Sequence, residues 1–165
     1  MIKPLAVDIQ NLTNKTLLSS PAIRRWARAA FGARGAGASL VIRFVGAAEG
    51  RRLNLLWRGR DYATNVLSFP PLLMPEPSRA VRATRRAKEP HLVGDLVLCA
   101  PVVAREAKEQ GKLIADHYAH LIVHGCLHLQ GYDHTDERAA QVMESLEIKI
   151  LAGLGITNPY LLETA

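Results

Sequence analysis

Four histidines fall within one long apolar stretch of the chain that has the composition of a single helix. The stretch covers residues 113–130, and its last two histidines are His124 and His128. At 3.6 residues per turn, these two side chains lie one turn apart on the same helix face. Any fold of this chain must therefore accommodate a long apolar helix that carries two imidazoles able to reach a single ion.

A glycine after this helix predicts a third ligand. Gly131 can adopt the left-handed conformation that ends a helix and turns the chain back, which brings His134 within reach. The pattern His-x-x-x-His-x-x-Gly-x-x-His predicts a three-histidine metal site at the end of the helix, with an open fourth position. One redox-inactive Zn²⁺ ion fits three imidazole nitrogens best. Because three neutral imidazoles leave the ion its full positive charge, it can lower the pKa of a bound water, which suits hydrolysis.

The remaining histidines and cysteines of the region are expected to have no part in metal binding. We expect His117 and His120 to be ordinary buried or surface residues, and Cys126 to be a core residue that points away from His124. Together with Cys99 it could form at most one disulfide, and the chain shows no secretory signal. Both observations favour a reducing compartment, the cytoplasm.

The length and composition predict a single domain over residues 1–165. The chain has 165 residues, of which 48% are hydrophobic and 22% charged, as in a soluble globular protein. No apolar run approaches the roughly 20 residues that span a bilayer, so we expect no membrane association. No segment suggests a small-molecule cofactor.

The pattern of apolar residues predicts an α+β fold. Strands are expected over residues 5–12, 39–45, 65–69 and 92–99, and helices over residues 20–31, 47–57, 101–110, 113–130 and 135–154. Ser20 and Thr135 are expected to cap two of the helices, and Leu53 and Leu56 to face inward from another. Because strands and helices do not alternate strictly, we expect a small mixed four-stranded sheet packed with about five helices.

Positive charge is concentrated in the first part of the chain. The formal net charge is +6, with eleven basic and two acidic side chains in residues 1–60 but two basic and six acidic in residues 132–165. This distribution fits a polyanionic partner such as RNA as well as it fits a solvated basic surface. Residues 70–91 are rich in proline and arginine and predict a mobile basic loop, either a solvated insertion or an RNA contact.

The histidine spacing alone would also fit a metzincin-like peptidase. In those enzymes a glutamate follows the first histidine and acts as the general base, but here that position is Gly125. A glycine cannot accept a proton, so the peptidase mechanism lacks its base at the expected place. Asp133 and Glu137 are candidates to replace it, although Asp133 could equally be a turn residue that orients a histidine.

The segment from His124 to His134 resembles the YbeY family of bacterial rRNA maturation endoribonucleases. Further resemblance lies in Leu53-Asn54, in Trp57-Arg58-Gly59, in Asp61 and residues 64–70, in residues 94–99, and in residues 153–155 and 158–160. The match runs in order from about Leu53 to Tyr160, interrupted by the basic loop.

The resemblance implies a zinc-dependent endoribonuclease specific for single-stranded RNA. It implies action at the 3′ end of small-subunit rRNA, a role in ribosome quality control, and ribosomal particles as partners, with ribosomal proteins as further candidates. Arg58 matches the family's functional arginine and would hold a phosphate, so the implied catalytic set is Arg58, His124, His128 and His134. Without the resemblance, the position of Arg58 at a helix end beside Gly59 favours a role in capping carbonyls over one in binding phosphate.

Two alternatives stay open at this point. One is a ribosome-binding assembly factor whose metal is structural, which the missing base at Gly125 would explain. The other is an amide hydrolase that uses the same three histidines.

Overall fold

The computed structural model describes residues 3–71 and 91–161 of the chain. Its elements, in chain order, are β1 (Ala6–Asn11), α1 (Ser20–Phe31), the 3₁₀ turn η1 (Gly32–Gly35), β2 (Ala38–Val45), α2 (Ala47–Arg58), β3 (Val66–Phe69), β4 (His91–Cys99), α4 (Ala100–Glu109), α5 (Ile114–Leu129) and α6 (Glu137–Gly153). The predicted α+β class is confirmed. The predicted basic loop over residues 70–91 falls mainly on residues 72–90, which lie outside the described residues.

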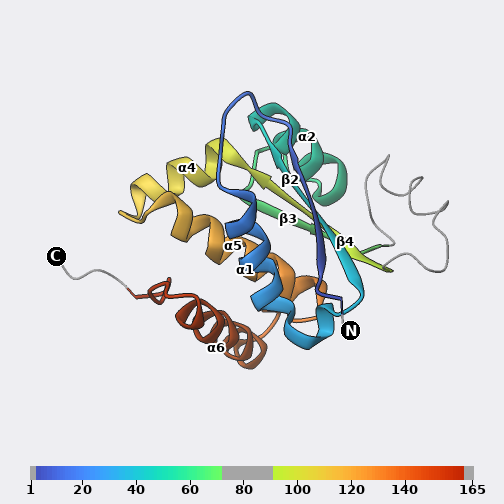
Figure 1. The fold of residues 1–165 in the computed structure, drawn as a ribbon. Helices are drawn as coiled ribbons and strands as arrows, with labels where there is room; N and C mark the ends of the chain where they lie inside the picture. Colours follow the sequence, from blue (N-terminus) through green and yellow to red (C-terminus); the bar gives the residue numbers. More distant parts are fainter. Residues whose placement is uncertain (1–2, 72–90, 162–165) are drawn as a thin grey trace.

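The sheet is mixed and has the strand order β1-β2-β4-β3 (Figure 1). Strands β1, β2 and β4 run parallel, with Ile42 of β2 opposite Ile9 on one side and Leu96 on the other. Strand β3 is antiparallel to β4 and forms one edge. It contains only four residues, because Pro70 follows it and cannot donate to a strand ladder.

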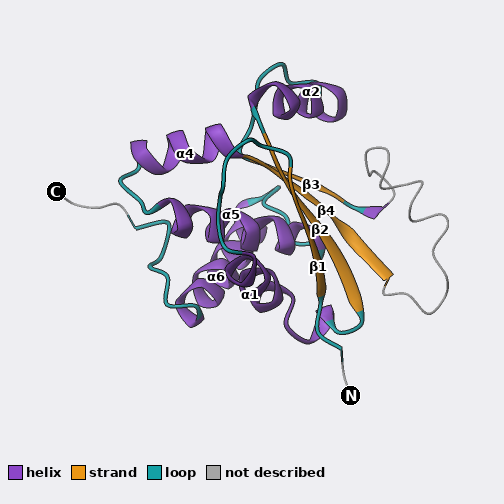
Figure 2. Cartoon of the chain, turned by 45° about the horizontal axis from the view of Figure 1, so that its top comes forward, coloured by secondary structure: helices purple, strands orange, loops and turns teal. Residues whose placement is uncertain are grey.

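The larger hydrophobic core lies between one face of the sheet and helices α1, α5 and α6, which Figure 2 shows together on one side of the strands. Leu40, Ile42 and Phe44 of β2 point into it, as their alternate positions require. A smaller cluster on the other face contains Val45 of β2 and Leu53 of α2. No helix among the described residues has the length and apolar character needed to cross a bilayer.

The two predicted helix caps are each wrong by one residue. Helix α1 is capped by Ser19, whose Oγ accepts a hydrogen bond from the amide of Ala22 at 3.3 Å, whereas Ser20 is already helical. Helix α6 is capped by Asp136, whose carboxylate accepts from the Ala139 amide at 2.7 Å, and not by Thr135. In both cases two cap-competent residues are adjacent, and the backbone geometry selects the one three residues before a free amide.

The inward face of α2 also differs from the prediction. Leu53 is buried as expected, but Leu56 is 62% exposed, and Asn54 takes the inward position instead. The Asn54 side chain donates to the carbonyl of Tyr62 at 2.7 Å. The buried side-chain amide of Asn54 therefore fixes the segment that leads from α2 into β3. Asn54 takes the inward position for this hydrogen bond, and Leu56 is left exposed.

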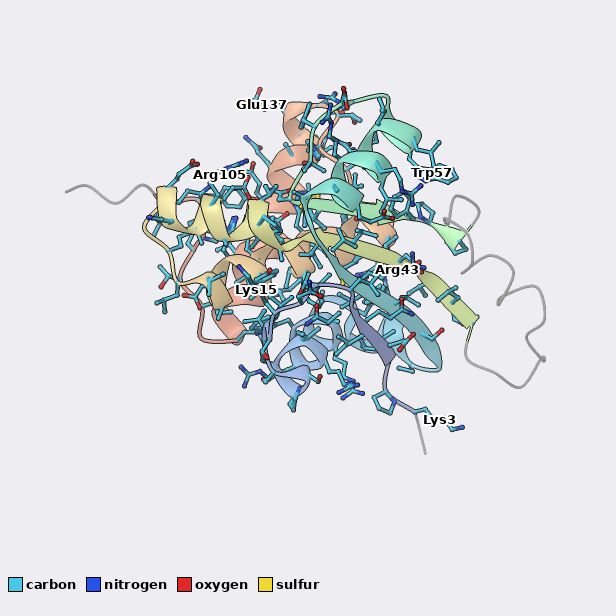
Figure 3. The ribbon with its side chains drawn as sticks, turned by 90° about the horizontal axis from the view of Figure 1, so that it is seen from above. Lys3, Lys15, Arg43, Trp57, Arg105 and Glu137 are labelled. Atoms are coloured by element: carbon cyan, nitrogen blue, oxygen red, sulfur yellow. The ribbon has the colours of Figure 1, made fainter. Side chains whose placement is uncertain are left out.

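A buried ion pair joins two neighbouring strands on the α2 side of the sheet. Arg43 of β2 and Asp95 of β4 approach to 2.9 Å, and their side chains are 10% and 0% exposed (Figure 3 labels Arg43). Each charge offsets part of the cost of removing the other from water.

Two glycines allow α5 to lie very close to the sheet. A Cβ atom at Gly94 of β4, where φ is +151°, would lie 2.6 Å from Leu129 Cδ2 and 2.8 Å from the Phe69 carbonyl oxygen. A Cβ atom at Gly125 of α5 would lie 2.7 Å from Leu96 Cδ2. The C-terminal half of α5 is thus held against β4, close to the edge strand β3.

Replacing Gly94 with alanine should lower the free energy of unfolding by about 3 kcal/mol, because the methyl group meets a backbone oxygen and alanine disfavours this φ. Urea unfolding followed by circular dichroism measures the change. Gly153→Ala is the control, since nothing lies within 4 Å of a Cβ atom there, and we expect a change of at most about 1 kcal/mol. A Gly94→Ala variant as stable as the wild type would contradict the close packing of α5 on β4.

Candidate metal centre

Helix α5 carries its four histidines along one stripe. His117, His120, His124 and His128 follow one another at spacings of three or four residues, so successive rings are neighbours on the helix surface. Beyond its first turn, which contains Asp116 and the exposed Ile114, the rest of the helix is largely apolar and buried against α1 and the sheet. The histidines of the stripe that lie in this buried part need polar partners from other elements.

The end of α5 is built as a Schellman motif. Gly131 has φ +99°, its amide donates to the carbonyl of His128 at 3.0 Å, and the Tyr132 amide donates to that of Leu127 at 3.1 Å. Tyr132 then packs against the larger core. The turn that the sequence predicts at Gly131 is present, and it directs the next residues back along the histidine stripe.

This turn brings His134 next to the last two histidines of α5. One ring nitrogen from each of His124, His128 and His134 lies within 4.8 Å of the other two. The Nε2 atoms of His124 and His128 are 3.0 Å apart. Ring centroids are separated by 4.5 Å for His124 and His128, 5.2 Å for His128 and His134, and 5.9 Å for His124 and His134.

The three side chains form a site that is closed on the protein side and open on the other. The His124 side chain is 25% exposed, whereas that of His134 is 60% exposed. Burial, together with the neighbouring His124 and His134 rings, lowers the pKa of His128. The ring of His128 is thus kept in its neutral form, which has a lone pair available for a metal ion.

The arrangement fits one zinc ion. Two nitrogens 3.0 Å apart can both approach an ion at the usual zinc–nitrogen distance of about 2.0–2.1 Å, and three imidazoles are a common donor set for catalytic zinc. The other nitrogen of His124, Nδ1, lies 2.5 Å from Oε1 of Glu147, so the Nε2 atom is the one left for a metal. Zinc binding itself stays a prediction.

Glu147 is the residue of this region that the sequence prediction missed. It lies on α6 and is fully buried, between Met143 and Leu151 on the inward stripe of that helix. A carboxylate in an apolar stripe at this spacing was a detectable signal, because an ionised side chain is rarely buried without partners. Its partners, however, lie 13 to 27 residues away in the chain, and no local pattern identifies them.

The two histidines expected to be ordinary residues have different surroundings. His117 is buried, with its Nε2 atom 3.0 Å from Glu106 Oε1, and the same oxygen accepts from the Asn65 side chain at 3.0 Å. This polar group ties α4, α5 and the start of β3 together, away from the three-histidine site. His120 instead points to Glu147, with Nε2 3.0 Å from Oε2, and so contacts the same carboxylate as His124.

Arg58 is the last residue of α2 and is exposed. Its guanidinium has no hydrogen bond or ion pair within residues 3–71 and 91–161, whereas Arg51 and Arg52 of the same helix are paired with Asp61 and Glu49. The carbonyls at the end of α2 accept from the backbone amides of Gly59 and Arg60. Arg58 is therefore available to an external anion and does not serve as a cap.

The neighbour of Arg58, Trp57, lies edge-on against Phe69 with centroids 6.0 Å apart. Trp57 is labelled in Figure 3 and is 41% exposed. Because Phe69 ends β3, this contact joins the end of α2 to the edge strand. The Ser68 side chain of the same strand donates to the Gly125 carbonyl at 3.4 Å, which links β3 to α5 beside His124.

The positions considered for the general base differ in their surroundings. At Gly125 a side chain would collide with Leu96. Asp133 accepts a hydrogen bond from the amide of His134 at 2.8 Å, and the same oxygen lies 3.6 Å from Nδ1 of the His134 ring. Glu137 is an exposed residue in the first turn of α6 (Figure 3).

Both cysteines are buried free thiols. Cys126 lies in the larger core and Cys99 in the smaller one. Burial raises the pKa of each thiol, which keeps it protonated and unreactive. The expectation that Cys126 is a core residue is confirmed.

Comparison with known proteins gives a consistent result over nearly the full chain. The family model described as "Endoribonuclease YbeY" matches residues 8–155. The endoribonuclease YbeY of Alkalilimnicola ehrlichii is 56% identical over 147 residues, which cover 86% of this chain and 81% of that protein. Those of Xanthomonas euvesicatoria and Pseudomonas putida are 53% and 47% identical, and the matches cover at least 93% of each chain.

A solved structure shares the fold. The solution structure of TM1509 from Thermotoga maritima superposes with a TM-score of 0.55 over 94% of this chain and 99% of that one, at 20% sequence identity. At this identity the similarity concerns the fold alone. The extent of the family match and the identity to the three bacterial relatives show that the chain belongs to the endoribonuclease YbeY family.

Proposed function

We propose that this chain is a zinc-dependent endoribonuclease that cuts single-stranded RNA. The observation that carries the proposal is the cluster of His124, His128 and His134, which is open to solvent on one side, in a chain of the YbeY family. The relatives are named as endoribonucleases, which supports RNA as the substrate.

In this proposal the three histidines hold the ion, and each has a distinct task. His124 is fixed by Glu147, His128 stays neutral because it is half-buried, and the exposed His134 leaves the outer side accessible to an RNA phosphate. When bound, zinc supplies a Lewis acid that polarises the phosphodiester and favours attack by water. The chain itself supplies the position and the orientation of the rings.

Arg58 is proposed to hold the phosphate. A guanidinium can donate two parallel hydrogen bonds to two phosphate oxygens, and its charge stabilises the extra negative charge of the transition state. The Arg58 side chain has no competing partner among the described residues. Its position on the last turn of α2, next to the Trp57–Phe69 contact, links it to the edge strand that borders α5.

The proposed target is rRNA, at the 3′ end of the small-subunit precursor, with a role in ribosome quality control in the cytoplasm. This finer assignment rests on the resemblance of the histidine segment to the YbeY family. The net charge of +6 supports binding to a polyanion such as a ribosomal particle, with ribosomal proteins as further candidate partners.

The packing at Gly125 argues against a peptidase. The helix lies so close to β4 that even a methyl group at this position would be 2.7 Å from Leu96 and 3.2 Å from the Ser68 hydroxyl. A glutamate in the metzincin position would therefore require the Leu96 side chain to shift. An assembly factor with a structural metal remains the alternative, and the experiments below separate it from the nuclease.

His128→Ala should abolish metal-dependent cleavage, because it removes one of three ligands and the remaining two cannot hold the ion in an open site. The assay compares zinc-loaded protein, chelated protein and the variant on single-stranded fragments of precursor rRNA, with zinc content determined for each preparation. His91→Ala is the matched control, since His91 is an exposed histidine at the start of β4, and it should keep wild-type activity.

Three other results would lead to different conclusions. Full cleavage by the chelated protein would refute zinc dependence. RNA binding without cleavage in all preparations would favour the assembly factor, and zinc-dependent turnover of an unstructured peptide would favour the peptidase.

Arg58→Ala should lower kcat/KM on single-stranded RNA about 100-fold, since a charged donor to the reacting phosphate is lost. Arg58→Lys should recover only part of the loss, because an ammonium group cannot make the two-pronged contact. Steady-state kinetics at fixed salt concentration provides the measurement. Arg52→Ala on the same helix is the control for a lost surface charge, and we expect at most about a threefold change. If the Arg52 and Arg58 variants lowered kcat/KM equally, Arg58 would act only through the overall surface charge, and its proposed contact with the phosphate would be wrong.

A further inference from the structure

A fully buried carboxylate connects the candidate metal site with the C-terminal part of the chain. Glu147 is 0% exposed, and three side chains surround it: His120 and His124 from α5, and Tyr160 from the segment that follows α6. We call these four residues the Glu147 cluster. A buried glutamate needs this number of partners, because its charge loses the solvation that water provides.

The three contacts are distributed over both carboxylate oxygens. Oε1 lies 2.5 Å from Nδ1 of His124, whereas Oε2 lies 3.0 Å from Nε2 of His120 and also accepts from the Tyr160 hydroxyl. Both carboxylate oxygens therefore face groups that can donate, and the ordinary ionised carboxylate has no proton of its own to offer them.

An acceptor-only partner determines which nitrogen of His124 carries the proton. Nδ1 must donate to Glu147, so Nε2 is left with its lone pair, directed at the Nε2 atom of His128 3.0 Å away. Metal-binding histidines commonly donate their second nitrogen to a carboxylate, which fixes both the tautomer and the ring orientation.

We infer that Glu147 is a positioning residue that holds His124 in the Nδ1–H tautomer and in the orientation needed to bind a metal through Nε2, while His120 and Tyr160 hold the carboxylate in place. This inference rests on the proposed metal site. It also assigns a task to His120, which is not one of the three ligands of that site.

The path of the C-terminal segment places Tyr160 in this cluster. After α6 the chain turns at Gly155, where φ is +78°, and the amide of Ile156 donates back to Leu151 at 2.9 Å. Lys112 then donates to the Pro159 carbonyl at 3.1 Å, which fastens the segment to the start of α5. The Tyr160 ring lies edge-on to His120, with centroids 5.3 Å apart. The segment therefore closes the cluster from outside.

Glu147→Gln tests the inference because glutamine has one acceptor oxygen instead of two. If that oxygen serves His120 and Tyr160, the amide group faces His124, and Nδ1 must accept. The proton then moves to Nε2 and blocks metal binding. We expect the zinc dissociation constant to rise about 10- to 100-fold in competition with a chromogenic chelator. The absorption spectrum of the cobalt-substituted protein should change as well.

Glu144→Gln is the matched control, since Glu144 is an exposed carboxylate one turn earlier on α6. It should leave the zinc affinity unchanged. Tyr160→Phe removes one of the donors to Glu147 but leaves the contact between Glu147 and His124 in place. We therefore expect at most a threefold loss of zinc affinity. Tyr160→Phe also tests the inference if Glu147→Gln fails to fold. A 10- to 100-fold loss of zinc affinity in Tyr160→Phe would contradict the roles assigned to Tyr160 and Glu147.

The tautomer can also be measured without any substitution. Long-range ¹H–¹⁵N correlation spectra of the histidine rings in the zinc-free wild-type protein should show His124 protonated on Nδ1 and not on Nε2. The Nε2–H form would overturn the inference, as would wild-type zinc affinity in Glu147→Gln. Binding of two zinc ions per chain, with one lost in this variant, would instead make Glu147 a ligand and would also overturn it. If the wild type bound no zinc, the proposed function would fail, while the NMR result would still test the tautomer.

Discussion

The structure depends on the burial of α5, a helix that is apolar on most of its surface and carries four histidines along one stripe. Burial of its apolar side against α1 and the sheet provides the core, but it also reduces the access of water to the histidine stripe. Partners must then come from the neighbouring helices. Glu106 of α4 serves the first histidine, and Glu147 of α6 serves the next two. Helices α4 and α6 therefore contact α5 through these carboxylate–histidine pairs as well as through apolar packing.

Local pattern was sufficient for most of the fold. Alternation and three-to-four spacing locate the strands and helices to within a few residues, and Gly131 marks the turn that brings His134 to His124 and His128. These features depend on residues close together in the chain. The caps at Ser19 and Asp136 were missed by one residue, because the geometry of the first turn and not residue type selects between adjacent candidates.

What the sequence could not supply are contacts between distant segments. The role of Glu147 depends on residues of α5 and of the C-terminal segment, and the helical period shows only that its side chain faces inward. The burial of Asn54 in place of Leu56 has the same origin, since it depends on the path of the chain at Tyr62. Buried polar groups are thus the weak point of prediction from pattern, because their partners are set by tertiary structure.

The close contact at Gly125 has a consequence for how such sites evolve. Chains that share the spacing of three histidines could, in principle, exchange chemistries by gaining or losing one acidic residue. Here the gain of an acidic side chain at Gly125 meets a steric cost, because the ends of the Leu96 side chain and the Ser68 hydroxyl would have to shift to admit it. Leu96 is itself fully buried in the larger core, so that shift is transmitted to the packing of the sheet. The packing around Leu96 therefore bears directly on which reactions the histidine site can acquire.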